Sequence, residues 1–440
     1  MDFELIQCAL GPLRLESAEL HALGAALSCL PRPAIRLRPG LSASELPFDT
    51  EPVRWHERGC FLAPQTRAAA YLHYGAGDYY IQDASSLLAV AALQAQPGEL
   101  ICDLCAAPGG KATAILDAVA ESGWLLANEA IHSRVNLLRF QLARYGVPRY
   151  NLAQLDPDQL ADLLGPRFDA VLVDAPCTGQ SLLSRGRQTP AAFQAQTIDH
   201  CCARQMRILN AAARLVRPGG RLVYSTCTFS FRENEAQIER FLAAHGHWQL
   251  VPCHHLAPWE TDAYPGCYRL WPHRHGCGGA FAAVMRHNAT STETDDTPQF
   301  MNRCESNTTL PFSLAEWGSL SNAVFHVRGD RCIAWPEAPP LRIHRAAPEG
   351  PEIACQRGKT WFPAQALATW RERSWSPRAL VELDNAAAAA YLQGGVVSTQ
   401  VRGWAVAVWR GRPLGWLKGD GMRGKNHLPK PARLSGRIMT

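Results

Sequence analysis

Short β-type runs alternate with longer helical segments from about Gly77 to His287, and this alternation constrains the fold more than any other feature of the sequence. The β-type runs are LICDLCA, WLLANEA, NLAQLD, FDAVLVDAP, GGRLVYSTC and GAFAAVMRH, and the segments between them include KATAILDAVAES, SRVNLLRFQLARYG and RENEAQIERFLAAHG. Strands that are separated by helices pair in parallel, because the helix carries the chain back to where the first strand began. The sequence therefore predicts an α/β domain whose sheet is covered by helices on both faces.

The 440 residues are too many for one ordinary core, so several domains are expected. Residues 1–75 mix short helical patterns with Pro-rich turns, which indicates a small leading domain. Residues 76–287 hold the alternating pattern. Residues 288–309 are polar and poor in large apolar side chains, which is typical of a linker. Residues 310–440 are expected to form a further globular region.

The composition and the first residues indicate the compartment in which the protein is expected to lie. With 47% hydrophobic and 19% charged residues, the chain is expected to be globular, and none of its apolar runs approaches the ~20 residues that span a bilayer. Its start, MDFELIQCALGPL, lacks the basic head and long apolar stretch of a signal peptide. We therefore expect a cytoplasmic protein without a membrane partner. The 15 cysteines are expected to be free thiols, because a reducing compartment disfavours disulfides.

Acidic side chains follow the first four strands of the predicted sheet. After the first strand comes DLCAAPGGKATAI, beginning at Asp103, in which a proline and paired glycines allow a tight turn onto the N-terminus of a helix. This loop matches neither GxxxxGK[ST] nor GxGxxG. Glu129, Asp156 and Asp174 follow the next three strands, and a carboxylate after the second strand is suited to ribose hydroxyls. One such carboxylate is usually a turn or a helix cap, but four in series indicate a nucleoside pocket.

Two cysteines lie at ends of the predicted strands. Cys177 follows the fourth strand in DAPCTGQS, and Cys227 follows the fifth in YSTCTFSFRENEAQ. Loops at this edge of an α/β sheet face the ligand, whereas Cys102 belongs inside a strand. A thiolate is a strong nucleophile, and it can activate cytosine C5 for methyl transfer by adding at C6. From these residues alone, Cys227 is either a nucleophile or a small buried side chain.

Together these motifs resemble the Sun/RsmF group of RNA cytosine-5 methyltransferases over nearly the whole chain. The resemblance rests on GDYYIQDASS, DLCAAPGGK, DAPCTG, YSTCTF with ENE, and RLWPHRHGCGGAF. It implies a Rossmann-like methyltransferase domain with a mostly parallel, seven-stranded sheet, a small N-terminal RNA-binding or accessory domain and a C-terminal PUA-like region. In this family the cysteine of the TCT motif attacks C6 and the cysteine of the APC motif assists breakdown of the covalent adduct. Those roles would fall to Cys227 and Cys177.

The resemblance also implies the cofactor and its contacts. Lys111 and Asp174 are expected beside the target base as further catalytic residues. Two departures from the family pattern, Ala112 after the lysine and Cys277 in the final motif, do not touch this chemistry. The residues expected to bind S-adenosyl-L-methionine are Cys105, Ala106, Ala107, Pro108, Gly109, Gly110, Lys111, Glu129, Asp156 and Asp174.

The C-terminal segment is strongly basic. Residues 401–440 carry a net charge of +8, which leaves −3 for the other 400 residues out of the total of +5. With Trp404, Trp409 and Trp416, the segment is suited to phosphates and stacked bases, although a charged surface over a tryptophan-rich core would give the same pattern. Its similarity to the closing segment of the bacterial RsmF type favours RNA. The nine cations are Arg402, Arg410, Arg412, Lys418, Arg423, Lys425, Lys430, Arg433 and Arg437.

The substrate that the resemblance implies is 16S ribosomal RNA, free or within the 30S subunit, methylated by a monomer. DNA is not expected, because DNA cytosine methyltransferases carry ENV where this chain has TCT. Two alternatives stay open: a transfer RNA methyltransferase, and a catalytically silent RNA-binding assembly factor, against which the intact pair of cysteines argues. No metal is expected, because the Cys- and His-rich stretch lacks regular ligand spacing. Its members are Cys253, His254, His255, Cys267, His273, His275 and Cys277.

Overall fold

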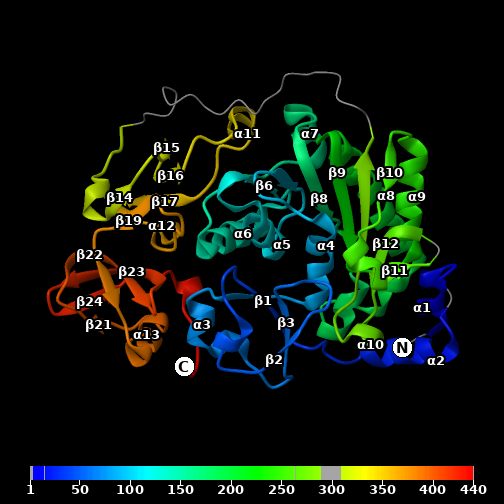
Figure 1. The fold of residues 1–440 in the computed structure, drawn as a ribbon, viewed down its shortest axis with the longest axis horizontal. Helices are drawn as coiled ribbons and strands as arrows, with labels where there is room; N and C mark the ends of the chain where they lie inside the picture. Colours follow the sequence, from blue (N-terminus) through cyan, green and yellow to red (C-terminus); the bar gives the residue numbers. More distant parts are fainter. Residues whose placement is uncertain (1–2, 14, 263, 289–308, 440) are drawn as a thin grey trace.

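The computed structural model describes residues 3–13, 15–262, 264–288 and 309–439. Figure 1 shows a central α/β domain in cyan and green, an N-terminal sheet in blue below it, and C-terminal sheets in yellow to red at its side. Most of the predicted linker, residues 289–308, lies outside the described residues. Across the described ranges, no helix is both long and apolar enough to cross a bilayer.

The N-terminal region combines helices with a small antiparallel sheet that the sequence pattern did not reveal. Strands of three or four residues are too short to show an alternation of apolar and polar side chains, so only helices and turns were expected here. The sheet has the order β2-β3-β1-β4. The elements are α1 (Phe3–Leu10), α2 (Ser17–Ala26), β1 (Ala34–Leu37), β2 (Thr50–Pro52), β3 (Gly59–Leu62), α3 (Leu72–Gly75) and β4 (Tyr79–Ile81).

The central sheet confirms the α/β fold class. Its order is β11-β12-β13-β9-β8-β5-β6-β7, with β10 also paired to β13. The five neighbouring strands β9, β8, β5, β6 and β7 run parallel to one another. The sheet has nine strands instead of the expected seven, because the two short strands β10 and β11 extend its antiparallel end. The strands are β5 (Leu100–Asp103), β6 (Trp124–Asn128), β7 (Tyr150–Ala153), β8 (Phe168–Asp174), β9 (Val216–Thr226), β10 (Trp248–Leu250), β11 (Glu260–Thr261), β12 (Tyr264–Leu270) and β13 (Ala280–His287).

Helices cover both faces of this sheet, as expected. Successive residues of β5 point to opposite sides, so Ile101 packs with α4, α5 and α6 while Cys102 packs with α7, α8 and α9. This two-sided burial explains why the strands are almost continuously apolar. The helices are α4 (Leu87–Leu93), α5 (Gly110–Val119), α6 (His132–Tyr145), α7 (Pro157–Leu164), α8 (Ala195–Ala213), α9 (Glu235–Ala244) and α10 (Pro272–His275).

The C-terminal region contains two main sheets. One has the order β15-β16-β17-β18, the other β20-β22-β23-β24-β21, and β14 pairs with β19 beside them. The elements are β14 (Gly318–Leu320), β15 (Val324–Arg328), β16 (Arg331–Trp335), α11 (Leu341–Ala346), β17 (Glu352–Arg357), β18 (Thr360–Pro363), α12 (Gln365–Ala368), β19 (Trp375–Pro377), β20 (Leu380–Glu382), α13 (Asn385–Leu392), β21 (Val397–Ser398), β22 (Arg402–Trp409), β23 (Arg412–Asp420) and β24 (Arg423–Asn426).

The first C-terminal sheet is joined to edge strand β7 of the central sheet (Figure 1). The buried Trp335 donates from Nε1 to the carbonyl of Tyr150 at 2.8 Å, and the amide of Leu152 donates to the carbonyl of Glu349 at 2.8 Å. Ile343 of α11 belongs to the same apolar cluster as α7 and α8. These contacts continue the core across the boundary, so this part of the C-terminal region is built onto the central α/β domain.

Candidate active site

The candidate site lies where the strand order reverses. β5 pairs with β6 on one side and with β8 on the other, so the helices that follow β5 and β8 leave in opposite directions and open a crevice at the carboxyl ends of these strands. Asp103 is the last residue of β5 and Asp174 is the last residue of β8. The topology alone therefore brings two of the four predicted carboxylates together.

The loop between β5 and α5 turns tightly onto the N-terminus of α5. Gly109 has a φ of +116°, a left-handed value that favours glycine, and α5 begins at Gly110. A Cβ atom at Gly110 would lie 3.3 Å from Tyr80 Cε1, so Gly110 packs closely against Tyr80 and a side chain there would require Tyr80 to shift. Arg134 braces the loop, because its Nη2 donates to the carbonyl of Ala107 at 2.6 Å. The loop's predicted contact residues, 105–110, thus surround the start of a helix.

Asp103 is fully buried, and neither of its carboxylate oxygens has a hydrogen-bond partner of ordinary geometry within the described residues. Burial and the charge of Asp174 raise the pKa of Asp103 to about 7, against the opposing effect of Lys111. A buried carboxylate in this condition is suited to a ligand that carries a cation or N–H donors. Its position at a strand end placed Asp103 in the predicted nucleoside pocket, but it was not among the cofactor contacts that the family resemblance implied.

Glu129 follows β6 directly and is 3% exposed. Its Oε1 accepts a hydrogen bond from the amide of Ile131 at 3.0 Å, and its Oε2 lies 3.1 Å from Nη1 of Arg134. The carboxylate is therefore oriented by its own loop and keeps capacity to accept further donors, as a pair of ribose hydroxyls would require. The unpaired oxygens of Asp103 and the carboxylate of Glu129 together fit a nucleoside that carries a cationic chain.

Asp156 is placed differently from the other three carboxylates. It lies beyond the end of β7, caps the N-terminus of α7 by accepting from the amide of Asp158 at 3.0 Å, and forms two hydrogen bonds with Arg207, at 2.8 and 2.9 Å. The Arg207 pair lowers the pKa of Asp156. Its side chain is 39% exposed. Its carboxylate is thus already engaged, and Arg207 on α8 gave no signal in the sequence.

Lys111 and Asp174 meet across the crevice. Lys111 lies in the first turn of α5, and its Nζ donates to Asp174 Oδ2 at 2.7 Å. Burial favours the neutral amine, but Asp174 outweighs it and raises the pKa of Lys111. The pair therefore places a fixed ammonium and a partly exposed carboxylate side by side, able to donate to and accept from a planar polar ring.

Cys177 and Cys227 also meet, as their positions at two strand ends predicted. Cys227 follows the last residue of β9, Cys177 lies three residues beyond β8, and their sulfur atoms are 3.3 Å apart. The hydrogen bond from Cys177, with smaller help from Ser181 and Lys111, lowers the pKa of the Cys227 thiol despite burial and the charge of Asp174. The same hydrogen bond raises the pKa of Cys177. The two sulfur atoms are thus in contact, and the opposite pKa shifts make Cys227 the more acidic thiol of the pair.

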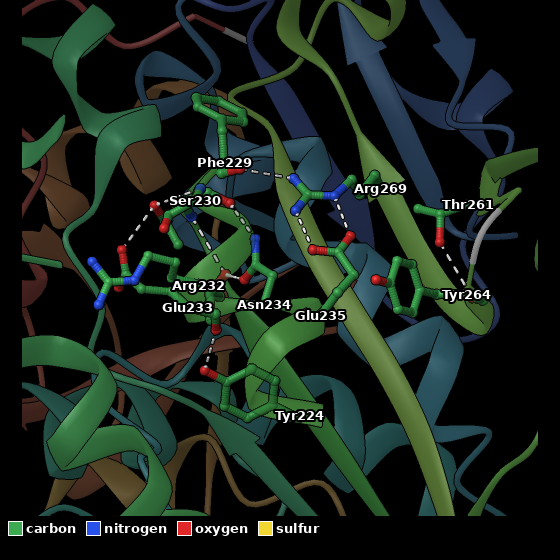
Figure 2. Close-up of polar contacts among 12 residues, drawn as sticks. Tyr224, Phe229, Ser230, Arg232, Glu233, Asn234, Glu235, Thr261, Tyr264 and Arg269 are labelled. Carbon is green, nitrogen blue, oxygen red and sulfur yellow. Dashed lines mark hydrogen bonds and ion pairs between the residues drawn. The ribbon is translucent and has the colours of Figure 1, made fainter. Parts of the chain in front are cut away.

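The loop of Cys227 is held by the ENE motif, whose role the sequence did not indicate. Glu233, Asn234 and Glu235 are all fully buried. Figure 2 shows Arg269 paired to Glu235 through two hydrogen bonds of 2.6 Å each. The side-chain Nδ2 of Asn234 donates to the carbonyl of Thr228 at 3.0 Å. Buried polar side chains so close to the two cysteines fix the backbone around them.

The three cysteines of the Cys- and His-rich stretch lie in the apolar core, whereas His254 and His255 are exposed. Cys253 and Cys277 pack on one face of the central sheet and Cys267 packs on the other. Within the described parts of the chain, no three His, Cys, Asp or Glu side chains converge as a metal site would need. These cysteines therefore act as small apolar side chains.

Two interpretations of the basic tail need correction. Trp404, Trp409 and Trp416 are at most 6% exposed, because the sheet that carries them is covered on both faces, so they are core side chains and cannot stack on bases. Arg412 is not a free cation either, since its Nε lies 2.6 Å from Oδ1 of the buried Asp78. The exposed cations of this region include Lys418 and Lys425, which face each other on β23 and β24.

Two segments of the chain match known protein families. Residues 90–286 match the family described as 16S rRNA methyltransferase RsmB/F, and residues 378–434 match the methyltransferase RsmF PUA domain. The ribosomal RNA small subunit methyltransferase F of Klebsiella pneumoniae is 34% identical over 251 residues, which are 54% of this chain and 52% of that protein. The aligned part of this chain therefore spans about half the length of that relative.

A longer alignment and a solved structure extend the comparison. The ribosomal RNA small subunit methyltransferase F of Aeromonas salmonicida is 29% identical over 417 residues, 87% of this chain and 85% of that protein. The crystal structure of a methyltransferase homolog protein from Pyrococcus horikoshii superposes with a TM-score of 0.54 at 25% identity, over 65% of this chain and 99% of that one. The Rossmann-like methyltransferase fold and the C-terminal PUA domain are thereby established.

Proposed function

Since the chain carries an RsmB/F-family 16S rRNA methyltransferase domain followed by an RsmF PUA domain, we propose that it transfers a methyl group from S-adenosyl-L-methionine to C5 of a cytosine in 16S ribosomal RNA. The observation that carries this proposal is the contact between the two cysteine sulfurs, 3.3 Å apart, with Cys227 made acidic by Cys177. This pair has the properties needed to add to an unreactive ring and to be released from it.

The cofactor would be held by the groups that surround the start of α5. Glu129 would accept the ribose hydroxyls, the loop of residues 105–110 would contact the methionine portion, and Asp103 would face its ammonium group. Asp156 would take part only at the rim, because Arg207 already engages its carboxylate. When bound, S-adenosyl-L-methionine supplies an electrophilic methyl group.

In the proposed mechanism the Cys227 thiolate would attack C6, and the electron pair of the C5–C6 double bond would form the new bond from C5 to the methyl carbon. The bond between that carbon and the cofactor's sulfur would break at the same time, and its electron pair would stay on the sulfur. Lys111 and Asp174 would hold the polar edge of the ring and polarise it during this addition. Loss of the C5 proton to solvent then restores the double bond and expels the Cys227 sulfur. The Cys177 thiol would donate its hydrogen bond to the departing thiolate, which makes Cys227 a better leaving group.

RNA recognition would combine the site with the PUA domain. A target base must leave its stack to reach half-buried sulfur atoms, so we expect a flipped or single-stranded cytosine. The exposed Lys418 and Lys425 would contact phosphates, and their adjacent strands place them on the same stretch of surface. The 16S target rests on the family of the two domains, and the cytosine-5 chemistry rests on the cysteine pair.

The two cysteine variants test this proposal because they must fail in different ways. Cys227→Ala should bind RNA but form no covalent complex and transfer no methyl group. Cys177→Ala should accumulate a methylated protein–RNA complex that survives denaturing electrophoresis. Cys355→Ala, a half-buried cysteine of β17 outside the site, is the matched control and should behave as the wild type.

Two outcomes would overturn the assignment. A trapped complex with Cys227→Ala but not with Cys177→Ala would exchange the two roles. Full methyl transfer by both variants would make Cys227 a packed side chain without a catalytic role. Bisulfite sequencing of 16S and transfer RNA from cells with and without the gene would identify the methylated cytosine and show which RNA carries it.

A further inference from the structure

Each of the two cysteines is followed by a threonine, and the two threonines converge on one buried carboxylate. Thr178 follows Cys177, Thr228 follows Cys227, and their hydroxyl oxygens lie 2.9 Å apart. Thr178 Oγ1 donates to Glu233 Oε1 at 2.6 Å, and Thr228 Oγ1 donates to the same oxygen at 3.2 Å. Glu233 therefore joins two loops that arise from different strands of the sheet.

The second oxygen of Glu233 is also fully used. Its Oε2 accepts from the backbone amide of Thr178 at 2.9 Å and from Nε2 of Gln205 at 2.8 Å. Gln205, on α8, donates from the same nitrogen to the carbonyl of Pro176 at 3.2 Å, just before Cys177. Burial raises the pKa of Glu233, while these donors favour its charged form. Four donors on two oxygens are the arrangement that an ionised carboxylate accepts and an amide cannot.

The backbone around Glu233 is held by side chains of β9 and β12 (Figure 2). Tyr224 of β9 donates from its hydroxyl to the backbone carbonyl of Glu233 at 2.7 Å. Arg269 of β12 pairs with Glu235 and also donates to the carbonyl of Phe229 at 3.1 Å. The backbone that carries the Glu233 carboxylate is therefore anchored to β9, and its neighbour Glu235 is anchored to β12.

We propose that Glu233 is a positioning residue that clamps the two Cys-Thr loops together and so sets the hydrogen bond between the Cys177 and Cys227 sulfur atoms. Two other hydrogen bonds also join these loops, from the amide of Ser181 to the carbonyl of Cys227 at 3.1 Å and from the amide of Phe229 to Oε1 of Gln180 at 2.9 Å. Neither involves Thr178 or Thr228, so without the clamp the segments that directly follow the two cysteines lose their shared anchor and the thiols can separate. Glu233 would not touch the substrate, and its effect on the reaction passes through Cys177. The inference rests on the proposed function for its catalytic meaning, but the test below needs neither RNA nor cofactor.

The direction of change at Cys227 separates positioning from simple electrostatics. Glu233→Gln keeps the shape of the side chain but turns two acceptor sites into donors, which would face the donors that now converge there. Loss of the negative charge alone would lower the pKa of nearby thiols. Loss of the hydrogen bond from Cys177 would raise the pKa of Cys227. The other groups that face Cys227, namely Asp174, Lys111 and Ser181, remain unchanged in the variant.

The experiment measures the rate at which iodoacetamide alkylates Cys227 as a function of pH, with the Cys227 peptide quantified by mass spectrometry. In Glu233→Gln the midpoint of the profile should rise by about one to two pH units, the equivalent of one hydrogen bond to a charged group. When Cys177→Ala is the background, Glu233→Gln should shift the midpoint by less than about 0.3 units, because the bond through which it acts is already absent. Ser230→Ala, in the same loop, is the control and should leave the midpoint in place.

A lowered or unchanged midpoint in Glu233→Gln would overturn the proposal, and so would an equal rise with and without Cys177. If Glu233→Gln does not fold, Thr178→Val removes one hydroxyl of the clamp and should raise the midpoint, while Thr178→Ser should restore it. Failure of Thr178→Val to move the midpoint would likewise refute the clamp. If the variants show these midpoint shifts but the wild-type protein transfers no methyl group to RNA, the proposed function is refuted and the clamp stands.

Discussion

Replacement of Arg412 by methionine should destabilise the protein without changing how it binds RNA. Arg412 lies on β23, and its Nε is 2.6 Å from Oδ1 of Asp78, a carboxylate that is only 2% exposed. The other oxygen of Asp78 lies 2.7 Å from Nδ1 of His73. His73 packs edge-on against Trp409, with ring centroids 5.0 Å apart. These contacts join the PUA domain to the segment before β4.

The size of the effect follows from the burial of Asp78. Removal of one partner from a buried ion pair costs about 3–5 kcal/mol, because the remaining charge is left uncompensated. We expect a loss near the lower end, about 3 kcal/mol, since His73 still hydrogen-bonds to Asp78. The double variant Asp78→Asn with Arg412→Met leaves no buried charge, so most of this loss should be recovered.

Equilibrium denaturation in urea, followed by tryptophan fluorescence, gives the free energy of unfolding of each variant. The buried Trp409 contributes to this signal and reports on unfolding of the PUA domain. Lys425→Met is the matched control, because Lys425 is an exposed cation on the neighbouring strand and should cost little stability. A loss below about 1 kcal/mol for Arg412→Met, or additive losses in the double variant, would refute the role of the buried pair. A flattened salt dependence of RNA binding in Arg412→Met, at unchanged stability, would return Arg412 to the RNA surface.

Three further results are expected. Glu129→Gln should weaken S-adenosyl-L-methionine binding about 10- to 100-fold by calorimetry, whereas Asp156→Asn should have a smaller effect, since Arg207 already holds that carboxylate; equal losses would contradict this ranking. The raised pKa of Asp103 means that the native cofactor-free protein keeps a proton that the unfolded chain has released between pH 3.8 and about 7, so stability should fall as the pH rises through this window, and Asp103→Asn should abolish that slope in urea titrations. Joint replacement of Lys418 and Lys425 by methionine should reduce the slope of log K against log salt for RNA binding by about 1.4 to 1.8, and an unaltered slope would place the phosphate contacts elsewhere.

The sequence determined the fold class and the edge of the sheet that carries the site. Continuous apolar runs between helices can only be strands of a sheet buried on both faces, and the loops after such strands meet at one edge by topology. The positions of Asp103, Asp174, Cys177 and Cys227 at that edge were therefore predictable from local pattern. The short N-terminal strands were not, because three or four residues carry too little periodicity.

What the tertiary structure alone decided is which neighbour each polar side chain finds. Asp156 meets Arg207 of a distant helix, Arg412 meets the buried Asp78, and Glu233 gathers the donors around both cysteines. The tryptophans of the tail are buried because two layers close over their sheet, which no count of charges could reveal. Local pattern reports how a segment pairs and which way it faces, whereas ion pairs and carboxylate clamps join residues far apart in the chain, where only packing brings them within hydrogen-bonding distance.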